Sequence, residues 1–180
     1  MKTLKSILNE NTTLSESILD DPEIFNKDFN KASENPFKYL ASLGPEVWED
    51  KNKVREAFEL FRLAITKECK IKPGDKAAGA KNKIAFDLDS QYGPTIWIKY
   101  GPYTRALEQS SIFGKPKYGR YLELREVGKS YAAHHFRGCD VYIPSQKLLD
   151  QYIEFKVLVV RNVSSIDGIK NMDAIKEYIK

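Results

Sequence analysis

The chain has 180 residues, 42% of them hydrophobic and 30% charged, which argues against wholesale disorder and favours one globular domain with a real core. Its 29 Lys and Arg residues against 25 Asp and Glu residues give a formal net charge of +4, a mild excess spread along the chain and not a basic tract of the kind that grips phosphates. Two cysteines are too few for a disulfide scaffold, and no apolar run approaches the roughly 20 residues that span a bilayer, so we expect a soluble protein with reduced thiols and no membrane partner.

Residues 1–31 are predicted to form a separable helical leader. The opening, "MKTLKSILNENTT", lacks the continuous apolar stretch of a secretory signal peptide. Thr13 and Glu16 have the spacing of a capping box, which predicts a short helix that ends before Pro22. Three apolar side chains of this helix need a partner surface, and we predict them as binding residues: Leu14, Ile18 and Leu19.

Further helices are predicted by polar residues that precede proline. Asp21–Pro22 and Asn35–Pro36 each have the pattern of an N-cap followed by proline at the first helical position, and "LGP" at 43–45 predicts a helix end. The longest predicted helix covers 50–70, where apolar residues recur at three- and four-residue steps over a wide stripe. A stripe of this width indicates a helix packed against a core.

Residues 35–180 are predicted to form a single α+β domain. Alternating apolar residues predict a strand over 83–90, and "TIWIKY" at 95–100 predicts its hairpin partner. After these, the pattern predicts a helix over 103–111, extended segments at 120–127, 130–136 and 140–143, a helix over 146–153 capped by Ser145, a buried strand over 155–160, and a last helix around Met172, Ile175 and Ile179. We therefore expect N-terminal short helices and a mixed or mainly antiparallel sheet of about five to six strands packed by helices.

Asp87 and Asp89 are the first candidates for chemistry. Two residues apart on a strand, they would point to one face and could hold a divalent cation. Metal-dependent nucleases of the restriction type place an acid on one strand and acid-x-lysine on a neighbour, and the nearest counterpart here is Glu123-Leu124-Arg125. In this hypothesis Asp87, Asp89 and Glu123 hold the ion, and Lys99 or Arg125 stabilises charge at the phosphate. The competing interpretation is the solvent face of a strand that ends in a turn, which we favour; we expect no metal and no cofactor.

The stretch "HHFRGCD" offers two further alternatives. His134 and His135 are adjacent, so on a strand they face opposite ways and do not readily serve one metal site. Cys139 with His135 could form a nucleophile and base, although a lone cysteine is more often simply buried. We expect one histidine in or near the core, one at the surface, and structural cysteines at positions 69 and 139.

Aromatic and basic residues are dense between positions 92 and 121. Such a surface can stack single-stranded bases or bind a protein, for which Tyr, Trp and Arg are equally suited, and acidic neighbours dilute the positive charge. We expect a protein partner, with nucleic acid as the alternative. The predicted binding residues are Trp97, Tyr100, Tyr103, Arg105, Tyr118 and Arg120.

The first quarter of the chain resembles a group of phage proteins. "MKTLKSILNE", "SESILDDPE" and "NPFKYLASL" are similar to the openings of uncharacterised small proteins of tailed phages and prophages of gut Bacteroidales, including crAss-like phages, which share an "ESILDD" leader and differ downstream. The resemblance implies an origin in a phage or integrated element and carries no catalytic residue. We therefore expect a non-enzymatic phage accessory or virion-associated protein that binds a phage or host protein, in the host cytoplasm or in the virion, with a small metal-dependent nuclease or other nucleic-acid-binding protein as the alternative.

Overall fold

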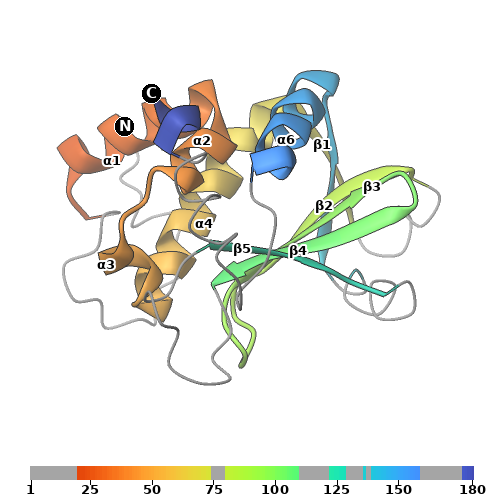
Figure 1. Ribbon diagram of the computed structural model, residues 1–180, viewed down its shortest axis with the longest axis horizontal. Coiled ribbons are helices and arrows are strands. Elements are labelled where there is room, and N and C mark those ends of the chain that lie inside the picture. Colours follow the sequence, from red (N-terminus) through yellow and green to blue (C-terminus); the bar gives the residue numbers. More distant parts are fainter. Residues whose placement is uncertain (1–19, 74–79, 110–121, 129–135, 137–138, 159–175) are drawn as a thin grey trace.

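A six-stranded antiparallel sheet forms the centre of the protein. The computed structural model describes residues 20–73, 80–109, 122–128, 136, 139–158 and 176–180. The strands lie in the order β1-β6-β2-β3-β4-β5 (Figure 1). Their bounds are β1 (Cys69–Pro73), β2 (Asn82–Asp87), β3 (Thr95–Tyr100), β4 (Tyr103–Gln109), β5 (Leu122–Glu126) and β6 (Asp140–Pro144). Strands β2 to β5 are joined in sequence order, whereas β1 and β6 pair over a long separation in the chain, and only two residue pairs join β6 to β2.

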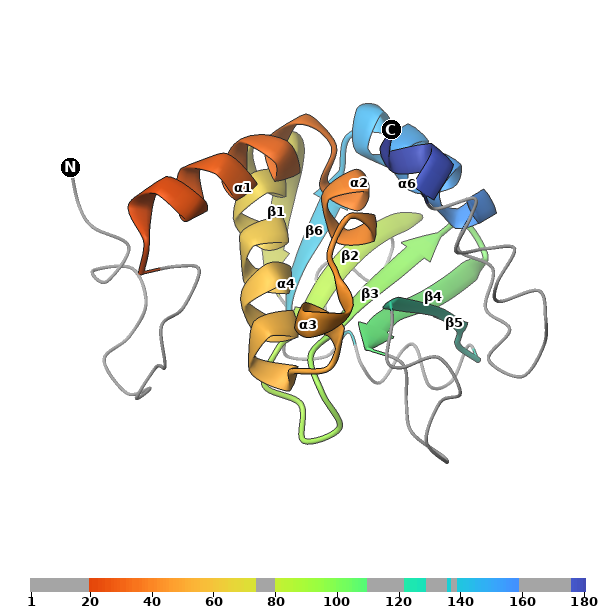
Figure 2. The ribbon, with the colours of Figure 1, turned by 60° about the vertical axis from the view of Figure 1, so that its left-hand side comes forward.

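The helices of the described chain cover one face of this sheet, which we call the helix face (Figure 2). They are α1 (Pro22–Glu34), α2 (Pro36–Ala41), α3 (Pro45–Trp48), α4 (Lys51–Ile65) and α6 (Gln146–Leu158), with a 3-10 turn, η2 (Thr66–Glu68), after α4. The predicted α+β class, with N-terminal helices and a mixed or mainly antiparallel sheet of about five to six strands, is thereby confirmed. No helix within the described ranges is long and apolar enough to cross a membrane.

Polar caps fix where the first helices begin. The Asp21 carboxylate accepts hydrogen bonds from the backbone N–H groups of Glu23 and Ile24, at 2.9 and 3.3 Å. The Asn35 side chain accepts from the Lys38 N–H at 3.0 Å, which starts α2. Both helix starts predicted from a cap followed by proline are confirmed, because these side chains satisfy donors that have no partner inside the helix.

Helix α1 is part of the packed domain. It lies against α2 and α4, and its Ala32 is fully buried. Phe25 and Phe29 stack at 5.6 Å between ring centroids and pack on the core. The boundary predicted at residue 31 therefore falls inside this helix. The predicted binding residues of the leader, Leu14, Ile18 and Leu19, lie outside the described residues.

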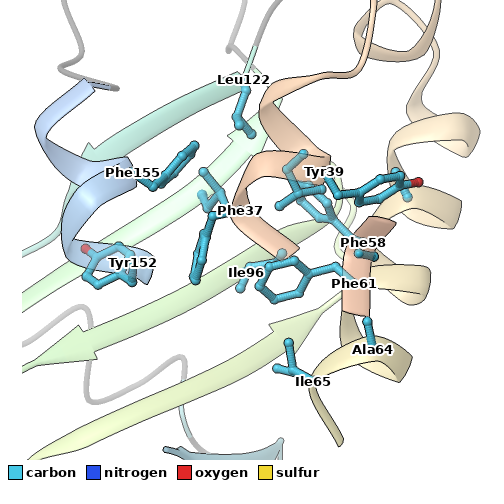
Figure 3. Close-up of a cluster of buried hydrophobic side chains, with 14 of the residues drawn as sticks. Phe37, Tyr39, Phe58, Phe61, Ala64, Ile65, Ile96, Leu122, Tyr152 and Phe155 are labelled. Carbon is cyan, nitrogen blue, oxygen red and sulfur yellow. The ribbon is translucent and has the colours of Figure 1, made fainter. Parts of the chain in front are cut away.

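The main core is aromatic and lies between the helices and the helix face of the sheet (Figure 3). Phe37 of α2 is at its centre, with ring centroids 5.2 Å from Phe61 of α4 and 5.3 Å from Phe155 of α6. Ile96 and Leu122 contribute from the sheet. A short helix of six residues is thus held by rings from α4 and α6, and burial of these rings stabilises it.

The helix predicted over 103–111 is wrong in the described part, since residues 103–109 form β4. Tyr100 and Tyr103 face each other across a two-residue loop, Gly101-Pro102, and Gly101 has φ of +58°. Proline cannot take a positive φ, so the loop matches a type II′ hairpin turn, which fixes an antiparallel partner for β3. Residues 103–109 therefore form a strand, although Tyr103, Ala106 and Leu107 have helical spacing.

Three further boundaries differ from the prediction. Residues 155–158, predicted as a buried strand, form the end of α6, because a short apolar run has no periodicity that separates helix from strand. The long helix ends at Ile65 and not at residue 70, and 69–73 form the missed strand β1. Pro45, predicted as a stop, is the first residue of α3, with Gly44 before it.

Candidate functional site

The residues predicted to hold a metal ion do not meet. The sheet face turned away from the helices is here called the far face. One row of cross-strand partners on this face consists of Asp87, Thr95, Glu108 and Glu123. Asp87 and Glu123 share this face, but three strand spacings of roughly 4.8 Å put their backbones about 14 Å apart. A divalent cation binds its oxygen ligands at roughly 2.0–2.6 Å, so these two residues cannot hold one ion.

Asp89 is also separated from Asp87. Strand β2 ends at Asp87, and the Asp89 carboxylate lies 2.9 Å from the Arg55 side chain of α4, on the helix side. The predicted shared face of the two aspartates is therefore wrong. No group of three or more His, Cys, Asp or Glu side chains is placed to hold a metal within the described ranges.

The structure does bring Glu123 and Arg125 close to a residue that the sequence analysis did not select. Glu123 is the cross-strand partner of Glu108 and is 1% exposed. The Arg125 side chain donates to the Glu108 carboxylate at 2.8 Å. Lys99 lies elsewhere on the far face, opposite Lys83, whose pKa is lowered by burial and by the charge of Lys99. The predicted catalytic set is thus spread over the far face and the helix side.

Both cysteines are half-buried and lie near acidic side chains of the described chain, a setting that does not favour a nucleophile. Burial raises the pKa of the Cys69 thiol to about 12, and burial also raises the pKa of Cys139. Both shifts favour the protonated thiol, which is a poor nucleophile. Cys69 and Cys139 form no disulfide with each other, and His134 and His135 lie outside the described residues.

The predicted aromatic and basic surface is divided between the two sheet faces. Trp97 points to the far face and is 3% exposed, in a small cluster with Ala85, Ala106 and Val141. Tyr100, Tyr103 and Arg105 share the helix face, because Tyr100 pairs with Tyr103 and Arg105 pairs with the core residue Ile98. Tyr118 and Arg120 lie outside the described residues.

The three residues on the helix face form, with α6, what we call the hairpin patch: Tyr100, Tyr103, Arg105 and Lys156. Tyr103 is 55% exposed, and the Arg105 guanidinium lies 5.6 Å from the centroid of its ring. The Lys156 ammonium lies 5.7 Å from the centroid of the Tyr100 ring. Arg105 also forms an ion pair with Glu126 at 3.4 Å. Lys156 was not predicted as a binding residue, because residues 155–158 were predicted as a buried strand and not as the end of α6.

A pocket of about 270 Å³ lies between α4 and the strands β2 and β6. Phe86 and Tyr142 line it, with ring centroids 5.5 Å apart. On the α4 side, Arg62 forms a bidentate ion pair with Glu59 and donates to the Tyr142 hydroxyl at 3.2 Å. These bonds raise the pKa of Arg62 above its usual range, so the guanidinium stays charged. No sequence motif marks this pocket, because its residues come from three separate segments.

Searches against protein-family models, curated proteins and solved structures give no match to this chain.

Proposed function

We propose that this protein is a non-enzymatic accessory or virion-associated protein of a phage or prophage, and that it binds a partner protein through the hairpin patch. The single observation that carries the proposal is the exposure of Tyr103, 55% accessible at the end of a tight hairpin with Arg105 beside its ring. Tyr and Arg side chains are frequent among the residues that dominate protein–protein binding energy, and the contact with Arg105 holds the exposed Tyr103 ring in place.

The patch has the rigidity that binding requires. The loop of two residues at Gly101-Pro102 fixes the hairpin end, and the Gly101 N–H donates to the Asn82 side chain at 3.1 Å. The cation–aromatic contacts at Tyr100 and Tyr103 restrict their rings before any partner arrives. Less conformational freedom is then lost on binding, which favours affinity.

The charge of the patch selects the kind of partner. Glu126 neutralises Arg105, which leaves the positive charge of Lys156 beside the Tyr100 ring. A partner surface with carboxylates next to apolar side chains complements this arrangement. The nuclease hypothesis has weaker support, because Asp87 and Glu123 are about 14 Å apart across the sheet.

The proposal is tested by affinity capture from phage-carrying host cells with wild type, Tyr103→Ala and Tyr92→Ala. Tyr92 is a matched control, since it is 89% exposed and lies in the loop at the other end of β3. We expect wild type and Tyr92→Ala to recover the same protein, and Tyr103→Ala to bind it at least about tenfold more weakly. Equal recovery by all three variants would contradict the hairpin patch as the binding surface.

Nucleic acid is the second candidate, since bases can stack on an exposed tyrosine such as Tyr103. The same capture is therefore repeated after nuclease treatment. If the nuclease removes whatever wild type captures and Tyr103→Ala does not, the partner is nucleic acid and not a protein. Recovery of one protein regardless of treatment supports the proposal.

A further inference from the structure

We propose that the pocket between α4 and strands β2 and β6 binds an organic cation, an ammonium or guanidinium group on a short alkyl chain. This site is separate from the hairpin patch and does not depend on it. The charges, the aromatic lining and the size of the pocket favour such a ligand.

The charges around the pocket leave one carboxylate uncompensated. Arg62 pairs with Glu59, and Arg55 pairs with Asp89 at 2.9 Å, so two guanidinium groups are matched by two carboxylates. Asp140, the first residue of β6, also lines the pocket, is exposed, and forms no ion pair with another described residue. The residual charge is negative, which attracts a cation.

Three of the five N–H groups of Arg62 already donate within the protein, which weakens the pocket as a site for an anion. Its Nε and one terminal nitrogen donate to Glu59, and the other terminal nitrogen donates to the Tyr142 hydroxyl. An anion would also meet the carboxylates of Asp89 and Asp140 at the pocket wall. Because Asp89 compensates the charge of Arg55, the carboxylate of Asp140, which is unpaired among the described residues, would repel an anion.

The aromatic lining suits a cation. Phe86 and Tyr142 meet edge to face, with an interplanar angle of 85°, and both line the pocket. Ring faces attract ammonium and guanidinium groups, more strongly where water is partly excluded. Tyr142 is 2% exposed, so the half-buried Phe86 is the ring that a bound cation would meet.

The size of the pocket limits the ligand to one short chain. Sites for drug-sized molecules start at roughly 300 Å³, and this pocket has about 270 Å³. A lysine or arginine side chain of another polypeptide and a free alkylamine share the required chemistry. The experiment below distinguishes these two sources.

The test follows backbone amide shifts by NMR during titration of the full chain. The cationic probe is N-acetyl-lysine amide, the neutral control of similar length is N-acetyl-norleucine amide, and the anionic control is N-acetyl-glutamate amide. We expect saturable shifts at Phe86, Asp89 and Asp140 with the lysine probe only. Asp140→Asn keeps the side-chain shape, and loss of one partly solvated charge should weaken binding about fivefold. Asp150→Asn, an exposed aspartate on α6, is the matched control and should leave the affinity unchanged.

Three results would overturn the proposal: no saturable shift with the lysine probe, equal binding of the norleucine or glutamate probe, or equal affinity in Asp140→Asn and wild type. The source is identified by the pentapeptide acetyl-Gly-Gly-Lys-Gly-Gly-amide. Binding of this peptide at least tenfold tighter than the lysine probe supports a polypeptide ligand. Equal affinity supports a free amine, and both outcomes support the cation site.

Discussion

Removal of either partner of the Glu59–Arg62 ion pair is expected to have unequal effects on stability. The Glu59 side chain is 6% exposed, whereas Arg62 is 31% exposed. Arg62→Met leaves the Glu59 carboxylate buried without a charged partner. Loss of one partner of a buried ion pair lowers the free energy of unfolding by roughly 3–5 kcal/mol. We expect about 3 kcal/mol here, because water reaches the arginine side of the pair. Glu59→Gln leaves a neutral amide and a guanidinium that can turn to solvent, so about 1 kcal/mol is expected.

The assay is urea unfolding followed by circular dichroism at 222 nm, with the free energy of unfolding from linear extrapolation. The double variant Glu59→Gln/Arg62→Met should lose less than the sum of the single variants, because it leaves no buried charge. Glu177→Gln is the control, since Glu177 and Lys180 have the same i,i+3 spacing but are both 73% exposed, and no measurable change is expected. Equal costs for the two single variants, or strict additivity in the double variant, would refute this reasoning.

Three other expectations follow from the fold. Gly101→Ala should lower the free energy of unfolding by about 1–2 kcal/mol in the same urea assay, because the φ of +58° is unfavourable for alanine. An added Cβ would cause no clash, since the nearest atom lies 3.8 Å away. Gly128→Ala, with open space around it, should change stability little, and equal effects of the two substitutions would contradict the turn assignment. Cys69 should react with iodoacetamide at pH 8 at least tenfold more slowly in the folded protein than in urea, measured by peptide mass spectrometry, because its pKa of about 12 leaves very little thiolate; equal rates would show that the thiol is not buried. Relative to a chain that lacks residues 1–19, deletion of residues 1–31 should lower the melting temperature by roughly 10 °C or more through loss of Phe25 and Phe29 from the core, and an unchanged value would show that α1 is dispensable.

Local signals in the sequence were sufficient for much of the fold. Asp21 and Asn35 cap helices in the predicted way, and the alternation in residues 83–90 and 95–100 correctly predicted the β2–β3 hairpin. The errors arose where a local pattern fits two structures. Residues 103–109 have apolar side chains at helical spacing, yet the turn at Gly101-Pro102 places them beside β3.

The candidate sites were harder to predict, because they depend on register and on distant segments. Asp87 and Glu123 do lie on one face, but only the strand order reveals that β3 and β4 separate them. Trp97 and Tyr100 are three residues apart on one strand and therefore point to opposite faces. The pocket joins residues of α4 to Phe86 and Asp140, a combination that no spacing along the chain could suggest.

The narrow junction between β6 and β2 has a consequence for the order of folding. Strands β2 to β5 follow one another along the chain, so their pairing closes comparatively short loops, whereas β1 pairs with β6 across about 70 intervening residues. In the backbone ladder of the described strands, the pairs Ile84–Tyr142 and Ala85–Val141 join the two halves of the sheet. We therefore expect the β2–β5 meander to form first and the β1–β6 pair to dock late, with amide hydrogens at this junction exchanging faster than those between β3 and β4. The cation pocket, with Phe86 on one half and Tyr142 on the other, is then completed only by this last step, and a ligand bound there would hold the two halves of the sheet together.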